Sequence, residues 1–256
     1  MINLRSVKDE KIFDTSLEYW NNTEMEKKKV FSSSKKLEND MQHNSFIDEL
    51  KKIISDSSTE KKSLMSIGCG VFWIESKILS FFPTIQRAVG IDFSRHRIHQ
   101  LAPKYIKELA VNDRQIDLYF GDVFDFRIDE KFDIIYLSKA FHHVHSPMML
   151  LSKLRDYLNE NGVIIISGEH LLSSIDYAKR VLFHLVKYIL RKDYRSKNSL
   201  LPEYSMLFPH SFEKGDFHYS NYTYSLMYRK MGFKFQRITH KELGFQTFVL
   251  IKGQYD

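Results

Sequence analysis

The sequence predicts an α/β protein with a doubly wound, mostly parallel sheet that ends in an antiparallel hairpin. From residue 63 to about residue 170, short apolar runs alternate with longer segments of helical periodicity. The runs are apolar on both faces, as in strands that are covered by helices on either side. The last two apolar runs are separated by only a few residues around Gly244, which favours a hairpin over a crossover.

The expected elements follow in chain order. We predict parallel strands at 64–67, 88–91, 116–120, 132–137 and 163–167. Helices over about 73–82, 95–110 and 147–158 would connect or flank them. A long helix at 173–195, a loop at 196–215 and a helix at 219–231 would precede the hairpin strands at 233–239 and 245–251. The sheet would therefore have seven strands.

The first 60 residues are predicted to form a helical cap, and residues 61–256 the main domain with a helical insertion at about 171–231. The polar stretch 55–63 marks the boundary. Before it, apolar residues recur at the three- and four-residue spacing of an amphipathic helix, namely Phe46, Ile47, Leu50, Ile53 and Ile54.

Composition limits the class of protein. With 43% hydrophobic and 27% charged residues in 256, the chain can form a full core. Its single cysteine, Cys69, excludes an intramolecular disulfide and a cysteine-based metal site. A charged N-terminal segment and the lack of an apolar run of about 18 residues predict a cytoplasmic protein. The net charge of +6 reflects an excess after residue 170, so we expect no nucleic-acid partner.

A glycine turn follows the first predicted strand. In SLMSIGCGVFWIE, residues 63–75, a strand leads into Gly68 and Gly70 and then into a helix. Two glycines let the backbone approach a bulky ligand, and the helix start presents unpaired amides to it. The alternative is a turn that needs glycine for its geometry only.

Two carboxylates follow the next two strands. Asp92, in GIDFS, ends the second strand and could accept hydrogen bonds from both hydroxyls of a ribose. Asp122, in GDVFDF, follows the third strand and could help to bind an adenine edge. A helix N-cap is the alternative role for Asp92, and a solvated turn for Asp122. Because the carboxyl ends of parallel strands share one edge of a sheet, the two carboxylates and the glycine turn should meet there.

These motifs, together with FDIIYLSKAFHHVHSP, resemble the class I S-adenosylmethionine-dependent methyltransferases, which have a Rossmann-like fold. The resemblance covers roughly residues 60–170. It implies that S-adenosylmethionine is the cofactor, with its methionine part at the glycine turn and beside residues 138–139, its ribose at Asp92 and its adenine at Asp122. The implied cofactor-binding residues are Ser66, Gly68, Cys69, Gly70, Asp92, Phe93, Asp122, Val123, Ser138 and Lys139.

The glycine turn departs from the family's pattern at two positions. The family usually has an acidic residue where this chain has Ser66, and a third glycine where it has Phe72. Glu75 is a candidate for the missing carboxylate that would pair with the ligand's ammonium group, although an exposed helix glutamate is an equal alternative. Phe72 could crowd the ligand. Trp73 occupies the position at which a nicotinamide-binding loop needs its third glycine, which disfavours that cofactor.

Candidate bases follow the fourth and fifth strands. Methyl transfer from a sulfonium needs alignment of the acceptor and, for some acceptors, removal of a proton. The catalytic candidates are His142, His143, Glu169 and His170, and His145 lies nearby. One of the two adjacent histidines is expected to be structural. Since adjacent side chains diverge, we predict no metal site.

The insertion offers two alternatives. The segment 173–195 has an apolar stripe flanked by lysine and arginine. This pattern fits a helix that packs on the sheet or forms part of a substrate lid, or a basic amphipathic surface that touches anionic lipid or an acidic partner. The tyrosine-rich segment 213–233, with Tyr19 and Trp20, could close a small-molecule pocket. We therefore expect methyl transfer to a small-molecule or lipid-like acceptor. The alternatives are a non-catalytic binding module with this fold and, less favoured, an RNA or protein methyltransferase.

Overall fold

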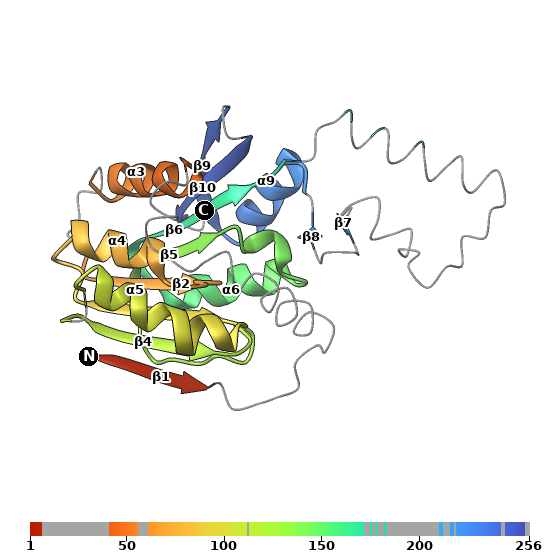
Figure 1. Cartoon of the computed structure of the whole chain (residues 1–256). Coiled ribbons are helices and arrows are strands. Elements are labelled where there is room, and N and C mark those ends of the chain that lie inside the picture. The colour runs from red at the N-terminus through yellow and green to blue at the C-terminus, as the bar shows by residue number, and fades with distance from the viewer. Residues whose placement is uncertain are drawn as a thin grey trace.

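The computed structural model describes residues 1–6, 41–55, 61–111, 113–171, 175, 178, 182, 210–211, 216–217, 219–241 and 244–253. A twisted sheet lies at the centre of the molecule, with helices on both of its faces (Figure 1). The strands of this sheet are β1 (Ile2–Ser6), β2 (Ser63–Ile67), β3 (Arg87–Asp92), β4 (Gln115–Phe120), β5 (Phe132–Ser138), β6 (Leu158–Glu169), β9 (Phe233–His240) and β10 (Phe245–Lys252). Their order is β1-β4-β3-β2-β5-β6-β10-β9.

The predicted doubly wound architecture is confirmed. Strands β1 to β6 pair in parallel, and β10 pairs antiparallel with both β6 and β9. The turn between β9 and β10 contains Gly244 with a φ of 69°, a backbone conformation that glycine adopts without a steric penalty. The order reverses at β2, so the strand that leads into the glycine turn lies at the switch point of the sheet.

Two helical layers bury the two faces of the sheet. The helical elements are α3 (Met41–Ser55), α4 (Trp73–Phe81), the π-helical segment η1 (Arg97–Leu101), α5 (Ala102–Glu108), the 3₁₀ turn η2 (Phe141–His143), α6 (Pro147–Tyr157) and α9 (Asn221–Lys230). Helices α3, α4 and α5 pack on one face through one hydrophobic cluster. Helices α6 and α9 pack on the other face through a second cluster. Each of the parallel strands β2 to β6 contributes to both clusters, which explains their mostly apolar sequences.

The expectation of seven strands was wrong by one. Residues 2–6, expected within the helical N-terminal part, add a parallel edge strand beside β4, with Ile2 opposite Ile116. The sequence signal is weak because Leu4 is exposed and the strand ends in polar residues. Its polar side chains are bound by β4 instead: Asn3 donates to Asp117 at 2.6 Å.

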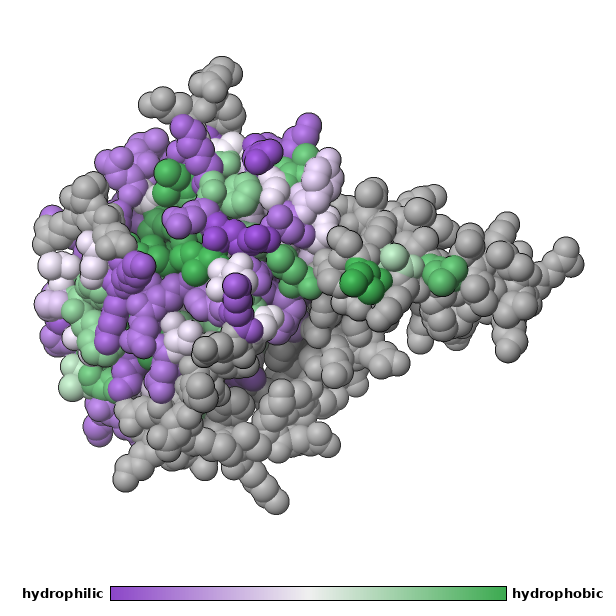
Figure 2. Space-filling view, turned by 90° about the horizontal axis from the view of Figure 1, so that it is seen from above, coloured by the Kyte–Doolittle hydropathy of each residue, from purple (hydrophilic) through white to green (hydrophobic). Residues whose placement is uncertain are grey.

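Several predictions for the insertion and the cap lie outside the described residues. These concern most of the helix 173–195, the loop 196–215, and the closing roles of Tyr19 and Trp20. The described residues of 173–195, Ile175, Ala178 and Leu182, are exposed. Hydrophilic and hydrophobic side chains are interspersed over the described part of the face seen in Figure 2. No helix among the described residues combines the length and hydrophobicity that crossing a membrane requires.

A small antiparallel pair and one bridge connect the insertion to α9. Strand β7 (His210–Ser211) pairs with β8 (Asp216–Phe217), and Leu171, just after β6, forms an isolated bridge with Tyr219. Tyr219 itself is buried against Phe141 of η2, with ring centroids 6.5 Å apart. The segment before α9 is therefore anchored close to the carboxyl ends of β5 and β6.

Asp117 in β4 anchors the β1 edge and gives a first testable prediction. Its carboxylate is 2% exposed and lies 3.0 Å from the guanidinium of Arg87 and 3.4 Å from that of Arg5. Asp117→Ala should lower the free energy of unfolding by about 1–3 kcal/mol, because Arg87 would lose a buried partner while Arg5 stays hydrated. Urea denaturation measures this loss. The matched control is Asp113→Ala, which removes an exposed pair with Arg114 and should cost less than about 1 kcal/mol. Equal losses in the two variants would contradict the assignment.

Candidate functional site

The glycine turn at the end of β2 is fixed to the neighbouring strand. The amides of Gly68 and Cys69 both donate to the carbonyl oxygen of Ile91 in β3, at 2.8 and 3.1 Å. Gly68 and Gly70 have φ values of 66° and 55°. A Cβ on Gly68 would lie 2.6 Å from the Cβ of Ala140, so only glycine fits there. The turn is therefore a rigid piece of backbone at the carboxyl edge of the sheet.

Asp92 joins this turn to the loops after β3 and β4. Its Oδ2 accepts a hydrogen bond from the Gly70 amide at 2.8 Å, and its Oδ1 accepts one from the Ser94 amide at 2.7 Å. Its carbonyl oxygen accepts from the amide of Gly121, in the loop after β4, at 3.1 Å. The carboxylate is fixed in position but stays partly exposed. Each carboxylate oxygen has a second lone pair with which it can accept from a ligand hydroxyl.

The loop after β4 carries Asp122, one residue after the Gly121 amide that donates to the Asp92 carbonyl oxygen. The Oδ1 of Asp122 accepts from the Phe124 amide at 2.8 Å, and burial raises the pKa of its carboxyl. The side chain of Val123 packs in the core, so this residue offers a ligand its backbone only. Phe93, next to Asp92, is partly exposed. The three loops that the sequence singled out thus lie next to one another.

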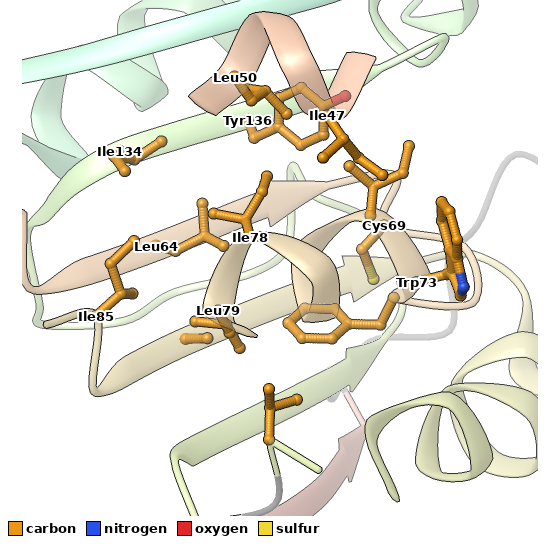
Figure 3. Close-up of a cluster of buried hydrophobic side chains, with 14 of the residues drawn as sticks. Ile47, Leu50, Leu64, Cys69, Trp73, Ile78, Leu79, Ile85, Ile134 and Tyr136 are labelled. Carbon is orange, nitrogen blue, oxygen red and sulfur yellow. The ribbon is translucent and has the colours of Figure 1, made fainter. Parts of the chain in front are cut away.

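Phe72 does not lie between these loops. Its ring is fully buried in the core that α4 and α5 form on the sheet, and a Cβ on Gly90 of β3 would lie 2.9 Å from the ring. Its backbone φ of 57° lets the chain complete the turn while the side chain points into the core. The side chain of Cys69 belongs to the same core, and Figure 3 shows it gathered with Ile78 between α4 and the strands. Crowding of a ligand by Phe72 is not what the geometry shows.

Ser66 and Glu75 form a buried pair beneath the turn. Ser66 lies in β2, two residues before Gly68, and its hydroxyl donates to Glu75 Oε1 at 2.5 Å. Glu75 is 3% exposed, on the first turn of α4. Burial raises the pKa of its carboxyl to about 7, since charge is disfavoured where water is excluded. The alternative of an exposed helix glutamate is wrong.

Ser138 ends β5, and Lys139 follows it beside α3. The Lys139 amide donates to the carbonyl oxygen of Ser167 in β6 at 2.8 Å, and the residue has a φ of 51°. Its ammonium lies 5.4 Å from the ring centroid of Phe46 in α3. A Cβ on Gly168 would meet the Lys139 side chain. Helix α3 thus covers the ends of β5 and β6.

A histidine, a glutamate and a tyrosine meet after these strands. His142 Nδ1 lies 3.2 Å from both carboxylate oxygens of Glu169, which is fully buried. The hydroxyl of Tyr224, in α9, donates to Glu169 Oε2 at 2.7 Å. Burial raises the pKa of the Tyr224 hydroxyl well above its ordinary value, so this group stays a donor. Sequence analysis placed Tyr224 only within the tyrosine-rich segment 213–233, because nothing in the sequence indicates its contact with Glu169 across 55 residues.

The other histidines have different surroundings. The ring of His143 lies 4.2 Å from that of His142, and His145 packs on Phe124 with ring centroids 4.8 Å apart. His170 is exposed, and its Nδ1 lies 3.1 Å from the carbonyl oxygen of Gly244, on the hairpin. Within the described ranges, no group of three histidine, cysteine, aspartate or glutamate side chains could hold a metal ion.

The doubly wound sheet, its glycine turn and the two carboxylates that follow define a class I methyltransferase fold. A family model described as a methyltransferase domain matches residues 38–236, so the chain belongs to this family. Solved structures with this fold include an S-adenosylmethionine-dependent methyltransferase from Clostridium acetobutylicum, at 12% identity and a TM-score of 0.59, with 90% of this chain and 100% of that one covered. PKMT2 from Rickettsia typhi, solved with AdoHcy, has 15% identity and a TM-score of 0.52, with 77% and 50% covered.

Curated relatives are similar over less than half of the chain. A malonyl-[acyl-carrier protein] O-methyltransferase of Halalkalibacterium halodurans is 25% identical over 119 residues, which are 44% of this chain and 41% of that protein. A second such enzyme, from Ilyobacter polytropus, is 26% identical over 115 residues, 45% and 42% of the two chains. The chain thus matches about two fifths of the length of these relatives.

Proposed function

We propose that this protein binds S-adenosylmethionine at the carboxyl edge of its sheet and transfers the methyl group to a small-molecule or lipid-like acceptor. The observation that carries the proposal is the position of Asp92. Its carboxylate is held by the amides of Gly70 and Ser94 and stays partly exposed, next to the loop that carries Asp122. Family membership and the O-methyltransferases among the relatives support the same chemistry.

Each loop has a distinct role in this proposal. The glycine turn would hold the methionine part of the cofactor, together with Ser138 and Lys139 at the carboxyl end of β5. Asp92, with Phe93 beside it, would accept the ribose hydroxyls, and Asp122 with the Val123 amide would bind the adenine edge. The bound cofactor supplies an electrophilic methyl group on a sulfonium. The chain's own contribution is to orient that group and to exclude water from it.

His142 is the candidate base on the acceptor side. Because Tyr224 donates to Glu169, the buried carboxylate favours a proton on His142 Nδ1, and the lone pair of the imidazole then lies on Nε2. Nε2 could take a proton from an acceptor hydroxyl as the methyl group is transferred. Glu169 would act as a positioning residue. His143 would be structural, and His170, on the hairpin side, has a smaller role in this proposal.

A calorimetric titration tests the cofactor proposal. Full-length protein titrated with S-adenosylmethionine should bind it with a Kd in the micromolar range, and should bind NAD far more weakly, because Trp73 fills the position of the third glycine. A folded protein that binds neither S-adenosylmethionine nor its product would instead favour the non-catalytic module. Release of S-adenosylhomocysteine, screened over hydroxylated small molecules and lipids, would then identify the acceptor.

A further inference from the structure

Glu75 is a buried carboxylate that has no cationic partner among the described residues. Its only side-chain hydrogen bond there is the one from Ser66, at 2.5 Å. The side chain points from α4 toward β2, which ends at the glycine turn. A carboxylate withdrawn from water and bonded to a single neutral hydroxyl is costly to keep charged.

Among the described residues, the groups that shift the pKa of Glu75 include no cation. The negative charge of Asp92, at the end of β3, raises the pKa of Glu75 further. Cys69 of the turn and Tyr136 of β5 lie close enough for Glu75 to raise their own pKa values. Arg97, in η1, acts on Cys69 but is not among the groups that shift the pKa of Glu75.

A second buried polar group lies in the same place. Tyr136 is fully buried in β5, next to β2; burial raises the pKa of its hydroxyl, and hydrogen bonding with Ser138 and Ser167 lowers it. Both Glu75 and Glu49, from α3, raise its pKa, so the hydroxyl lies near two carboxylates. Glu49, however, has its own partners, Thr247 at 2.6 Å and His240 at 3.1 Å. Of the two carboxylates near Tyr136, Glu75 is therefore the one without an imidazole partner among the described residues.

We propose that Glu75, positioned by Ser66, pairs with the ammonium group of the cofactor's amino-acid part, and that this pairing displaces a proton from Glu75. The inference rests on the proposed function, since it needs a ligand whose amino-acid part lies at the glycine turn. A ligand cation offsets the cost of the buried negative charge, and the cost explains why the free protein holds a proton there.

This pairing makes cofactor affinity depend on pH. The pKa of Glu75 is raised to about 7 in the free protein, so the carboxyl is mostly protonated below that pH. An ammonium ion binds the charged form, so binding releases a proton and weakens as pH falls. If only the charged form binds, affinity should drop about tenfold from about pH 8 to about pH 6.

Two ligands separate this contact from the rest of the site. S-adenosylhomocysteine carries the ammonium group, whereas 5′-methylthioadenosine has the same adenosine but no amino-acid part. Glu75→Gln should lower the affinity for S-adenosylhomocysteine about tenfold or more, since it removes an ion pair within a buried site. The affinity for 5′-methylthioadenosine should stay unchanged. It should also abolish the pH dependence and the proton release, which calorimetry in buffers of different ionisation enthalpy measures.

Control variants complete the test. Glu49→Gln removes a buried carboxylate that already has partners, and should not change the ratio of the two affinities. Adding Ser66→Asp to Glu75→Gln should restore preference for S-adenosylhomocysteine. The inference would be overturned if Glu75→Gln changed the affinities for both ligands by the same factor. It would also be overturned if the variant still released a proton when S-adenosylhomocysteine binds. Failure of the wild-type protein to bind either ligand would instead overturn the proposed function on which it rests.

Discussion

An Asp92→Ala variant is expected to bind S-adenosylhomocysteine about a hundredfold more weakly than the wild-type protein. The change removes the acceptor for the ribose hydroxyls, and charge-assisted hydrogen bonds of this kind contribute about 1.5–3 kcal/mol. It also removes the carboxylate that accepts from the amides of Gly70 and Ser94, so the glycine turn loses its link to the loop after β3. Isothermal titration calorimetry measures the loss.

The comparison ligand distinguishes Asp92 from Glu75. Because 5′-methylthioadenosine retains the ribose, its affinity should fall with that of S-adenosylhomocysteine in Asp92→Ala. An Asp125→Ala variant, which changes an exposed carboxylate in the loop after β4, serves as the control and should bind both ligands normally. Unchanged affinity in Asp92→Ala would show that the ligand binds elsewhere.

A His142→Ala variant is expected to slow methyl transfer to a hydroxyl acceptor by about 10²–10⁴-fold, the range over which general bases contribute. Affinity for S-adenosylhomocysteine should stay close to that of the wild type, because the histidine follows β5 on the acceptor side. Single-turnover formation of S-adenosylhomocysteine, measured with the hydroxyl acceptor that the screen identifies, separates the two quantities.

Variants of the neighbouring residues test how His142 is held. Glu169→Gln should slow the reaction less than His142→Ala, since the base remains but its preferred tautomer is lost. His170→Ala is the matched control, because this exposed imidazole contacts the hairpin at Gly244. A His142→Ala protein with wild-type rate would exclude His142 as the base. A large loss of rate in His170→Ala alone would instead indicate that the base follows β6.

The parallel part of the fold could be predicted from the sequence because its strands are buried on both faces. Each one therefore appears as a mostly apolar run, such as IIYL in β5. The expected bounds of β2 to β5 agree with the observed ones within one residue, whereas β6 begins at Leu158, five residues before the expected start. Strand β1 carries no such signal: it lies at the edge, exposes Leu4, and binds through Asn3 and Arg5 to a carboxylate more than 100 residues away. A contact of that kind is not encoded in local periodicity.

The candidate site divides in the same way. The glycine turn, Asp92 and Asp122 follow directly from strand ends, which meet at one edge in any parallel sheet. The pairs Ser66 with Glu75 and Glu169 with Tyr224 depend instead on how α4 and α9 are rotated against the sheet. Sequence patterns predict the spacing of residues along a helix. Packing of the helix against the sheet decides which of its side chains contacts a particular strand residue.

The left-handed backbone at Phe72 has a consequence for how affinity could change in this protein. A bulky residue in that conformation is unfavourable by about 1 kcal/mol or more, and burial of its ring over Gly90 offsets this. A side chain at position 90 would lie too close to the Phe72 ring and to the Cys69 sulfur, so it would displace two residues of the glycine turn. If this turn holds the cofactor as proposed, substitution of Gly90 should change affinity without a direct contact to the ligand.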